Sequence, residues 1–510
     1  MKAVVAAGHE VTARACADML RAGGNAFDAA MAGMVASTIS ETILSSLGGG
    51  GFMMAYRADR DETVLYDFFA QTPKQKRPVD ELDFHAIHAD FGPATQEFHI
   101  GAGSTATPGV IPGLFAIHQD LCTLPLGQLL APALGLARSG LTVSAFQAYL
   151  FEVVEPILTK DPAAVRLFAP HGTLLKAGEL FRNPRLAHTL ETLVKEGEHS
   201  FREGELGRAI IDQSANHGGH LTSQDLLDYR VERRKPLQQT YHKQQFFLNP
   251  APCAGGPMIA FSLGVLEQLC PDHTPSLVEL VRTMSLTNQA RQEKSCTLEN
   301  FANEPHIAQH LASTTSHHPS YRGTTHISVI DGDSNAASLT ISNGEGNGLM
   351  LGKTGIMLNN MLGEEDLHDD GFRSWTTDQR LSSMMAPTLI KSPDNSLTAL
   401  GSGGSNRIRS AILQVASGLA DHGFSLAEAI EAPRLHCEQD GKISFEDQPA
   451  SAPFTAAGKQ ELLDTYPDAH AWPGPNMFFG GVHGVQKTST GQVEGKGDPR
   501  RDGVAIEIVG

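Results

Sequence analysis

The sequence has few cysteines, few basic side chains and no long hydrophobic run. Its six cysteines are scattered over 510 residues without a CxxC pair, so neither a zinc ribbon nor a redox motif is indicated. Lysine and arginine total 39 against 57 acidic residues. The resulting net charge of −18 disfavours nucleic acid or an anionic membrane surface as the main partner. The most apolar stretches, 31–39 and 348–361, are interrupted well before the roughly 20 residues that a membrane-spanning helix requires.

The N-terminus lacks the features of a secretory signal. Only five apolar residues separate Lys2 from Gly8, whereas a secretory hydrophobic region has about 7–15. Scattered thiols in a large chain are typical of a reducing compartment. The sequence therefore predicts a cytoplasmic protein, and a periplasmic location stays open if the N-terminus has been trimmed.

Glycine, by contrast, is in excess. It accounts for 51 of the 510 residues, against roughly 7% in average proteins. Many of these glycines gather at 48–51, 255–256, 344–348 and 401–404. Such clusters are typical of backbone that bends tightly or approaches another group closely.

Hydrophobic spacing divides the chain into a mostly helical first part and a second part that opens with a hairpin. A helix over 26–37, capped by Asn25 and built of small residues on every side, is predicted to be buried. The polar segment 303–323 is predicted to be an exposed linker. The other predicted elements are helices at 10–22, 114–121, 126–139, 184–196, 276–291 and 408–420, and strands at 52–56, 244–248, 326–330, 336–342, 388–391, 397–400 and 503–508.

Common nucleotide and metal motifs are incomplete in this sequence. The run Gly352-Lys353-Thr354 is similar to the end of a phosphate-binding loop, but Asn347 stands where that motif needs a glycine. Histidines at 317–318 and the group 368–370 lack the spacing of a closed metal site. We therefore expect no metal ion and no cofactor.

Thr324 stands at the start of the predicted hairpin, directly after the linker and Gly323. A threonine hydroxyl is a weak nucleophile unless a base is adjacent, and the α-amine of an N-terminal threonine is such a base. Cleavage of the Gly323–Thr324 bond would create that amine. If the hairpin turn centres near Asp333, Ser342 lies opposite Thr324 and can hydrogen-bond to it. Spacing alone favours the simpler interpretation that this threonine only begins a strand.

Gly403 and Gly404 are candidates for the oxyanion hole that acyl transfer needs. They lie between a predicted strand and the helix at 408–420, so their backbone N–H groups can point at a developing negative charge. In isolation, a glycine-rich turn without a catalytic role explains the pair equally well.

Taken in order, segments of this chain resemble the gamma-glutamyltransferase family over nearly the whole length. The TTH, LSSM and GSGGS segments are specific in combination. The resemblance implies an α+β fold, the four-layer αββα sandwich of N-terminal-nucleophile hydrolases. The segments that carry it are AGGNAFDAA (22–30), LGGGGFM (47–53), TPGVIPG (107–113), GGHLTSQDLLDYR (218–230), PAPCAGG (250–256), TTHISVIDGDSNAASLTIS (324–342), GIMLNN (355–360), LSSMMAPT (381–388), GSGGSNRI (401–408), APRLH (432–436) and GDPRRDG (497–503).

By the same resemblance, the chain is a precursor that cuts itself before Thr324. The products would be a large subunit, 1–323, and a small subunit, 324–510. The two would stay together as a heterodimer within one intertwined domain, with higher oligomers left open.

The resemblance also assigns roles to single residues. It makes Thr324 the nucleophile, with Ser342 as its supporting hydroxyl and Gly403 and Gly404 as the oxyanion-hole glycines. Ser382 and Ser383 match a serine pair that binds the glutamyl α-carboxylate. The further substrate-binding residues that it implies are Glu364, for the α-amine, and Asn343, which lies near the family's substrate-binding asparagine.

One position departs from the family pattern. The arginine that clamps the glutamyl α-carboxylate in the family falls at Phe69 in this sequence. Phenylalanine cannot replace a bidentate, charge-assisted contact, whose loss would cost about 2–4 kcal/mol. Lys74, Lys76 and Arg77 are the nearby basic residues that would have to substitute for it.

Three functional hypotheses follow. The first is a self-processing enzyme that hydrolyses or transfers the acyl group of γ-glutamyl-type amides such as glutathione. The second is an amidase for another acyl group, such as an acylated lactam or a small dicarboxylic amide, with Phe69 lining an apolar pocket. The third is a catalytically silent binding protein on the same scaffold. In each case the partner is a small molecule rather than nucleic acid or membrane.

Overall fold

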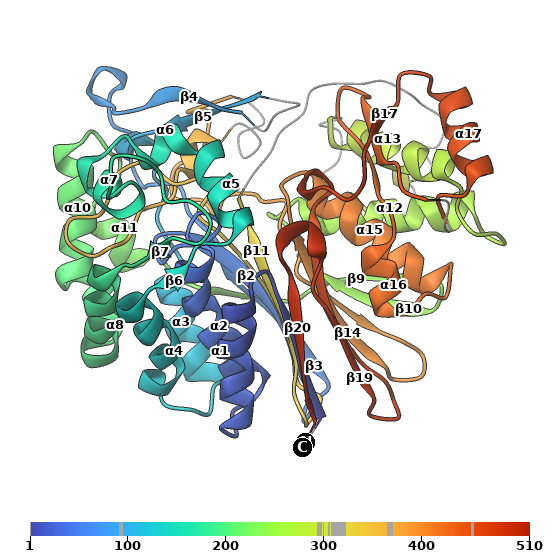
Figure 1. The fold of residues 1–510 in the computed structure, drawn as a ribbon, viewed down its shortest axis with the longest axis horizontal. Helices are drawn as coiled ribbons and strands as arrows, with labels where there is room; N and C mark the ends of the chain where they lie inside the picture. The colour runs from blue at the N-terminus through green and yellow to red at the C-terminus, as the bar shows by residue number, and fades with distance from the viewer. Residues whose placement is uncertain are drawn as a thin grey trace.

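The computed structural model describes residues 2–90, 95–292, 298, 300–303, 306–307, 323–364, 371–449 and 453–509. Two antiparallel sheets face each other, and a layer of helices covers the outer face of each (Figure 1). This arrangement confirms the predicted α+β, four-layer αββα sandwich. Most of the predicted linker at 303–323 lies outside the described residues, as do the histidines at 317–318 and the group 368–370.

The first sheet has seven strands, which come from the chain both before and after Gly323. Its two central neighbours, β11 and β12, form the predicted hairpin, and β1 and β20 bring the two ends of the chain together. In spatial order the strands are β20 (Val504–Val509), β1 (Lys2–Ala7), β11 (Thr325–Ile330), β12 (Ala336–Ser342), β2 (Gly50–Arg57), β3 (Glu62–Phe68) and β8 (Glu232–Arg234).

The second sheet has six strands and also mixes the two parts of the chain. Its strand β14 lies against β11 and β12 of the first sheet. In spatial order the strands are β19 (Val493–Lys496), β18 (Gly481–Lys487), β14 (Leu397–Gly403), β13 (Thr388–Lys391), β10 (Gln244–Leu248) and β9 (Leu237–Tyr241). Because both sheets take strands from before and after Gly323, neither part of the chain completes a sheet by itself.

Helices from the first part of the chain cover the first sheet (Figure 1). Helix α2 contacts β11 and β12, and all of its residues are buried, which confirms the predicted buried helix. Its N-terminus is capped by the Asn25 side chain, which accepts hydrogen bonds from two backbone N–H groups. The helices on this side are α1 (Glu10–Arg21), α2 (Ala26–Ser40), α3 (Val110–Leu121), α4 (Leu126–Ser139), α5 (Ala145–Val153), α6 (Glu155–Leu158), α7 (Pro162–Phe168), α8 (Pro184–Glu196), α9 (His199–Arg202), α10 (Glu205–Asn216) and α11 (Ser223–Asp228).

The second helical layer joins residues from both parts of the chain. Helix α15 packs on β14 and on α12, so the segment that follows Gly404 is fixed from two sides. The helices of this layer are α12 (Gly255–Leu269), α13 (Leu277–Gln292), α15 (Arg407–Ala420), α16 (Leu426–Glu431) and α17 (Ala456–Thr465). Smaller sheets are formed by β4 (His85–Asp90) with β5 (Thr95–Ile100), by β6 (Leu141–Thr142) with β7 (Leu180–Phe181), and by β15 (Leu435–Cys437), β16 (Ile443–Glu446) and β17 (His470–Trp472).

Within the ranges that the structure describes, no helix combines the length and apolar character needed to cross a membrane.

Candidate active site

The peptide bond between Gly323 and Thr324 lies at the entrance to β11, where Thr324 is buried. Ser342 Oγ donates a hydrogen bond of 2.6 Å to the carbonyl oxygen of Gly323 and accepts one of 3.0 Å from the Gly344 N–H. The Gly323 N–H donates to Glu345 Oε1 at 2.6 Å. The residue before Thr324 is therefore held at both its amide and its carbonyl, and the carbonyl is polarised by a hydroxyl.

The hairpin register explains why Ser342 reaches this bond. Thr325 pairs with Ile341 across β11 and β12, so the next positions outward bring Thr324 opposite Ser342. This is the register that the sequence predicts. The hydrogen bond differs in one respect, because in the uncleaved chain the Ser342 hydroxyl contacts the carbonyl before Thr324.

Gly403 lies directly against Thr324, and Gly404 follows it in the chain. A Cβ atom at Gly403 would collide with the carbonyl oxygen of Thr324, so only glycine permits this approach of β14 to β11. Gly404 has a φ of +119°, a conformation that other residues rarely adopt. Close packing at Gly403 and the backbone conformation of Gly404 therefore both favour glycine, at the point where the two N–H groups are expected to act.

Arg501 lies on the other side of the same glycines. Its Nη1 is 3.0 Å from the position of a Cβ atom at Gly403, and its Nη2 is 3.2 Å from that at Gly404. The side chain is 5% exposed, and its stem packs on Gly481. Burial lowers the pKa of Arg501 to about 10, with the charges of Asp498 and Glu345 opposing that shift. The guanidinium is therefore still a cation at neutral pH.

A second buried charge lies next to Thr325. Glu41 accepts hydrogen bonds from the hydroxyls of Thr325 and Thr12. Burial raises the pKa of Glu41 to about 7, although both hydroxyl contacts favour its charged form. Thr325, the residue directly after Thr324, is thus hydrogen-bonded to a carboxyl that titrates near neutrality.

Glu364 and Asn360 fix the loop that follows Ser342. Asn360 Oδ1 accepts hydrogen bonds from the N–H groups of Glu345, at 2.8 Å, and Gly346. A Cβ atom at Gly344 would collide with the carboxylate of Glu364 and with Asn360. The structure therefore places Glu364 beside the loop that follows Ser342, and its role in binding the substrate α-amine stays a prediction.

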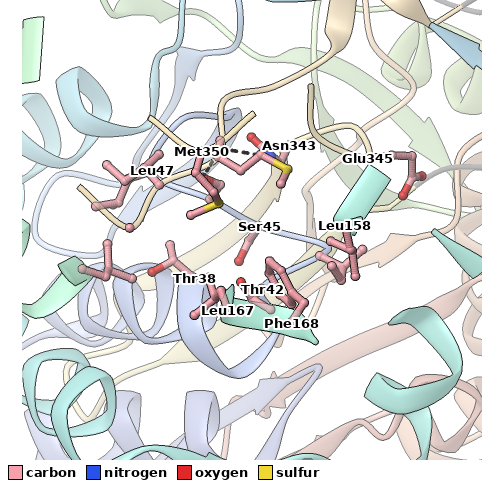
Figure 2. Close-up of a pocket in the computed structure, with 16 residues that line it drawn as sticks. Thr38, Thr42, Ser45, Leu47, Leu158, Leu167, Phe168, Asn343, Glu345 and Met350 are labelled. Carbon is pink, nitrogen blue, oxygen red and sulfur yellow. Dashed lines mark hydrogen bonds between the residues drawn. The ribbon is translucent and has the colours of Figure 1, made fainter. Parts of the chain in front are cut away.

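Asn343 lines a pocket beside this loop. Figure 2 shows Asn343 and Met350 facing Thr38 and Thr42, with Glu345 at one end of the pocket. Asn343 Nδ2 donates to the Met357 carbonyl at 3.4 Å, while its Oδ1 is buried and accepts no hydrogen bond from the described residues. Because Glu345 also binds the Gly323 N–H, the pocket adjoins the candidate cleavage site.

Comparison with known proteins gives this geometry a context. The family model described as Gamma-glutamyltranspeptidase matches residues 12–508. The chain is 27% identical to the Acylase ACY 1 proenzyme of Pseudomonas sp. (strain V22), covering 100% of this chain and 94% of that protein. It is 24% identical to the Glutathione hydrolase proenzyme of Bacillus subtilis (strain 168), covering 99% and 91%. The crystal structure of cephalosporin acylase from Bacillus halodurans superposes with a TM-score of 0.85 at 22% identity, covering 99% of this chain and 95% of that one.

The chain belongs to the gamma-glutamyltranspeptidase family. It is an enzyme of the N-terminal-nucleophile hydrolase type that hydrolyses acyl amides. Membership in this enzyme family removes the hypothesis of a catalytically silent binding protein.

In this member of the gamma-glutamyltranspeptidase family, Phe69 belongs to the core between the sheets. Its ring stacks on Phe52 with 5.2 Å between centroids, and the residue is 2% exposed. Its carbonyl accepts hydrogen bonds from Tyr229 and Arg380. The sequence analysis suggests that Phe69 lines an apolar substrate pocket, whereas in the structure its ring already packs against Phe52.

The basic residues suggested as substitutes for the missing arginine have partners elsewhere. Lys74 pairs with Asp378 at 2.8 Å and with Asp228 at 3.1 Å. Lys76 donates to the Arg373 carbonyl, and Arg77 donates to the Gly219 carbonyl. Each of these side chains contributes to surface loops.

The serine pair lies near the turn that precedes α12. Ser383 Oγ accepts a hydrogen bond from the Met385 N–H, and the Ser383 carbonyl accepts from Ala254 and Gly255. Ser382 is partly exposed. The contacts of the Ser383 side chain are thus local, and the substrate role of both serines stays a prediction.

Three residues of the site carry no role in the sequence analysis: Glu345, Arg501 and Glu41. Arg501 lies within the GDPRRDG segment, but a motif alone does not indicate which of its arginines reaches the site. Glu345 lies in the glycine cluster at 344–348, and a single carboxylate within such a cluster is a pattern that could have indicated a functional residue. Glu41 follows a buried helix, and only the tertiary structure brings it to Thr325.

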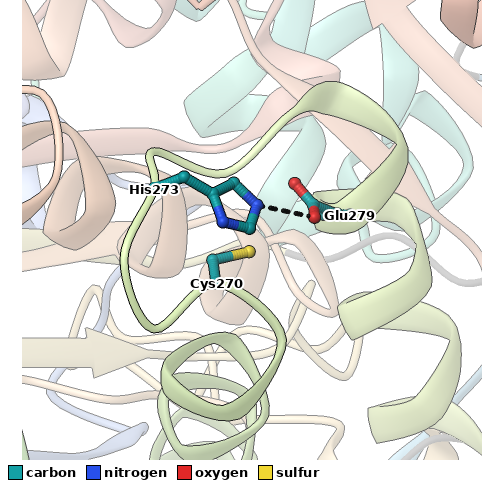
Figure 3. A group of neighbouring side chains, drawn as sticks. All are labelled: Cys270, His273 and Glu279. Atoms are coloured by element: carbon teal, nitrogen blue, oxygen red, sulfur yellow. Dashed lines mark hydrogen bonds and ion pairs between the residues drawn. The ribbon is translucent and has the colours of Figure 1, made fainter.

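One group outside this site has metal-ligand chemistry. Cys270, His273 and Glu279 lie together between α12 and α13, with a hydrogen bond of 2.9 Å from His273 to Glu279 (Figure 3). Glu279 also accepts a hydrogen bond from the Ser276 N–H at the start of α13. That contact gives the carboxylate a helix-capping role without an ion.

Proposed function

We propose that this protein is a precursor that cleaves its own Gly323–Thr324 bond and then uses Thr324 as an N-terminal nucleophile to hydrolyse or transfer acyl groups from small amides. The observation that carries the proposal is the hydrogen bond from Ser342 Oγ to the Gly323 carbonyl, at the bond directly before Thr324. The proenzyme names of the two relatives support it. The products would have 323 and 510 − 323 = 187 residues.

In the self-cleavage step, Thr324 Oγ attacks the Gly323 carbonyl carbon. The Ser342 hydroxyl stabilises the negative charge on the carbonyl oxygen. The peptide C–N bond breaks, the nitrogen takes the proton that the Thr324 hydroxyl gives up and becomes the α-amine, and an ester joins Gly323 to Thr324 Oγ. Water hydrolyses this ester and releases the carboxylate of Gly323. Until then, the N–H of Gly323 is held by its hydrogen bond to Glu345.

In the amidase reaction, the new α-amine of Thr324 accepts the proton of its own hydroxyl as Oγ attacks the substrate carbonyl. Gly403 and Gly404 are the proposed donors to the oxyanion, and the contact of Gly403 with the Thr324 main chain supports this role. The C–N bond breaks, the amine leaves with the proton, and an acyl ester forms on Thr324. Water gives hydrolysis, and an acceptor amine gives transfer.

For the acyl group, γ-glutamyl-type amides such as glutathione are the first candidate. The relative named Glutathione hydrolase supports this choice. The second candidate is an amidase for another acyl group, such as an acylated lactam or a small dicarboxylic amide. The buried position of Phe69, where the family pattern has an arginine, favours the second candidate.

The test is an incubation of the purified full chain followed by gel electrophoresis and N-terminal sequencing. We expect two bands, the smaller beginning with Thr324, and Thr324→Ala is expected to leave a single band. Ser334→Ala, in the hairpin turn, is the matched control and should cut normally. A wild-type chain that stays uncut, or a Thr324→Ala chain cut at the same bond, would refute the proposal.

A further inference from the structure

Arg501 stands apart from the other buried arginines of the described residues. Arg407 pairs with Glu438, Arg434 with Asp498, and Arg380 contacts Asp67 at 3.4 Å. Arg500 pairs with Glu446 and Asp498, and Arg409 donates to Asn288. For Arg501 the described residues provide no ion pair within 4 Å, and its Nε and Nη1 donate no hydrogen bond.

An unpaired buried guanidinium is costly, because it has given up water without a replacement. The nearby carboxylates of Asp498, Glu345 and Glu41 act on Arg501 only through their charges. Asp498 is engaged by Arg434 and Arg500, and Glu41 by two threonine hydroxyls. The donors of Arg501 therefore remain available to an anion from outside the chain.

The position of Arg501 is that of a substrate contact. Its guanidinium lies next to Gly403 and Gly404, and Gly403 touches the main chain of Thr324. The Thr324 carbonyl oxygen and Arg501 Nη1 both lie within 3.0 Å of the Cβ position of Gly403, so the guanidinium is close to the main chain of the proposed nucleophile. A guanidinium binds a carboxylate through two parallel hydrogen bonds and cannot bind a methyl group in that way.

Building on the proposed function, we propose that Arg501 binds the distal carboxylate of the substrate's acyl group, in place of the arginine that Phe69 replaces. The substrates are then amides of short dicarboxylic acids. This class includes both γ-glutamyl and glutaryl amides, which carry a carboxylate at the same distance from the reacting carbonyl. Arg501 is the residue that sets this specificity.

The test compares glutaryl p-nitroanilide with pentanoyl p-nitroanilide on the self-cleaved enzyme. Both acyl groups have five carbons, and they differ only in the terminal carboxylate. We expect wild type to prefer the glutaryl substrate, and Arg501→Met to reduce that preference on the order of 100-fold, mainly through KM. Arg501→Lys, which keeps the charge without the planar fork, should retain part of the preference.

Other outcomes separate this inference from the proposed function. An equal loss of activity on both anilides in Arg501→Met would assign Arg501 to oxyanion stabilisation or to structure, and would overturn the inference. If Arg501→Met does not fold, inhibition of wild type by glutaramate but not by pentanamide, which lacks the terminal carboxylate, would still support it, and equal inhibition would overturn it. A wild-type chain that never cleaves would refute the proposed function instead.

Discussion

The surroundings of Thr324 and of Phe69 differ in how completely their polar groups are paired. Near Thr324, Arg501 Nε and Nη1 are buried and have no hydrogen-bond partner in the described part of the chain, and Glu41 is a buried carboxyl with a raised pKa. Around Phe69, the ring stacks on Phe52, and Arg380 donates to the Phe69 carbonyl and, at 2.5 Å, to the hydroxyl of Tyr229. Arg380 Nε is also buried without a hydrogen bond, but it lies 3.4 Å from the carboxylate of Asp67, whereas Arg501 has no ion pair within 4 Å among the described residues. The first region therefore holds a buried charge without a counter-charge in contact, which is typical of functional sites, and the second does not.

The two regions depend on different features of the structure. The geometry at the Gly323–Thr324 bond depends on the hairpin register and on glycines that permit close contact. The position of Phe69 depends on side-chain packing between the sheets. A substitution in the second region can therefore alter substrate recognition while the first region keeps its geometry.

Gly403→Ala is the strongest way to break the region around Thr324. The new methyl group would collide with the Thr324 carbonyl oxygen, which belongs to the backbone and cannot rotate away. We expect no self-cleavage on a gel and no amidase activity. Gly135→Ala is the matched control, because nothing lies within 4 Å of its Cβ position in α4, and it should stabilise the protein by about 0.5–1 kcal/mol. Normal cleavage of Gly403→Ala would show that the close contact is not needed.

Phe69→Arg tests whether the second region can be restored to the family pattern. The arginine would enter a packed, apolar position without an ion-pair partner, so we expect a loss of about 4 kcal/mol or more in the free energy of unfolding. Hydrolysis of a γ-glutamyl anilide should not increase. Phe69→Leu, which keeps the position apolar, should lose only about 1 kcal/mol. A stable Phe69→Arg variant with raised γ-glutamyl activity would show that the site still accepts the family's clamp.

The sequence predicts some features of these two regions and not others. The buried helix α2 and the register opposite Ser342 follow from local patterns, because periodicity and turn position act within a few residues. The sandwich follows from the resemblance to the family rather than from these patterns. The packing of Phe69 on Phe52 and the approach of Arg501 to Gly403 join segments far apart in the chain. The direction of the Ser342 hydrogen bond depends on the Gly344 N–H that fills its acceptor site, which a strand pattern does not encode.

Ser342→Ala should slow self-cleavage while leaving the hairpin intact. It removes the donor to the Gly323 carbonyl, and loss of one such donor typically costs 100- to 1,000-fold in rate, or about 3–4 kcal/mol. The rate is measured from the appearance of the smaller band over time. Ser342→Thr retains a hydroxyl and is expected to cut at a rate closer to wild type. An unchanged rate in Ser342→Ala would remove the serine from the cleavage step.

Glu41→Gln should change how stability depends on pH, and it gives the smallest of these effects. Folding raises the pKa of this carboxyl from 4.5 to about 7. Between these pH values the native state binds more protons than the unfolded state. The contribution of Glu41 to stability is therefore present below pH 4.5 and is lost as pH rises through 7. At about 1.36 kcal/mol per pKa unit, the loss is about 3 kcal/mol. Glutamine does not ionise, so the stability of Glu41→Gln relative to the parent should increase by about 2.5 kcal/mol from pH 5 to pH 8. Urea unfolding in the uncleaved Thr324→Ala background measures it on a single chain, with exposed Glu10→Gln as the control that should follow the parent curve. Parallel curves for parent and Glu41→Gln would mean that Glu41 does not titrate in this range, and that the strand beginning at Thr325 is not coupled to a protonation event near neutral pH.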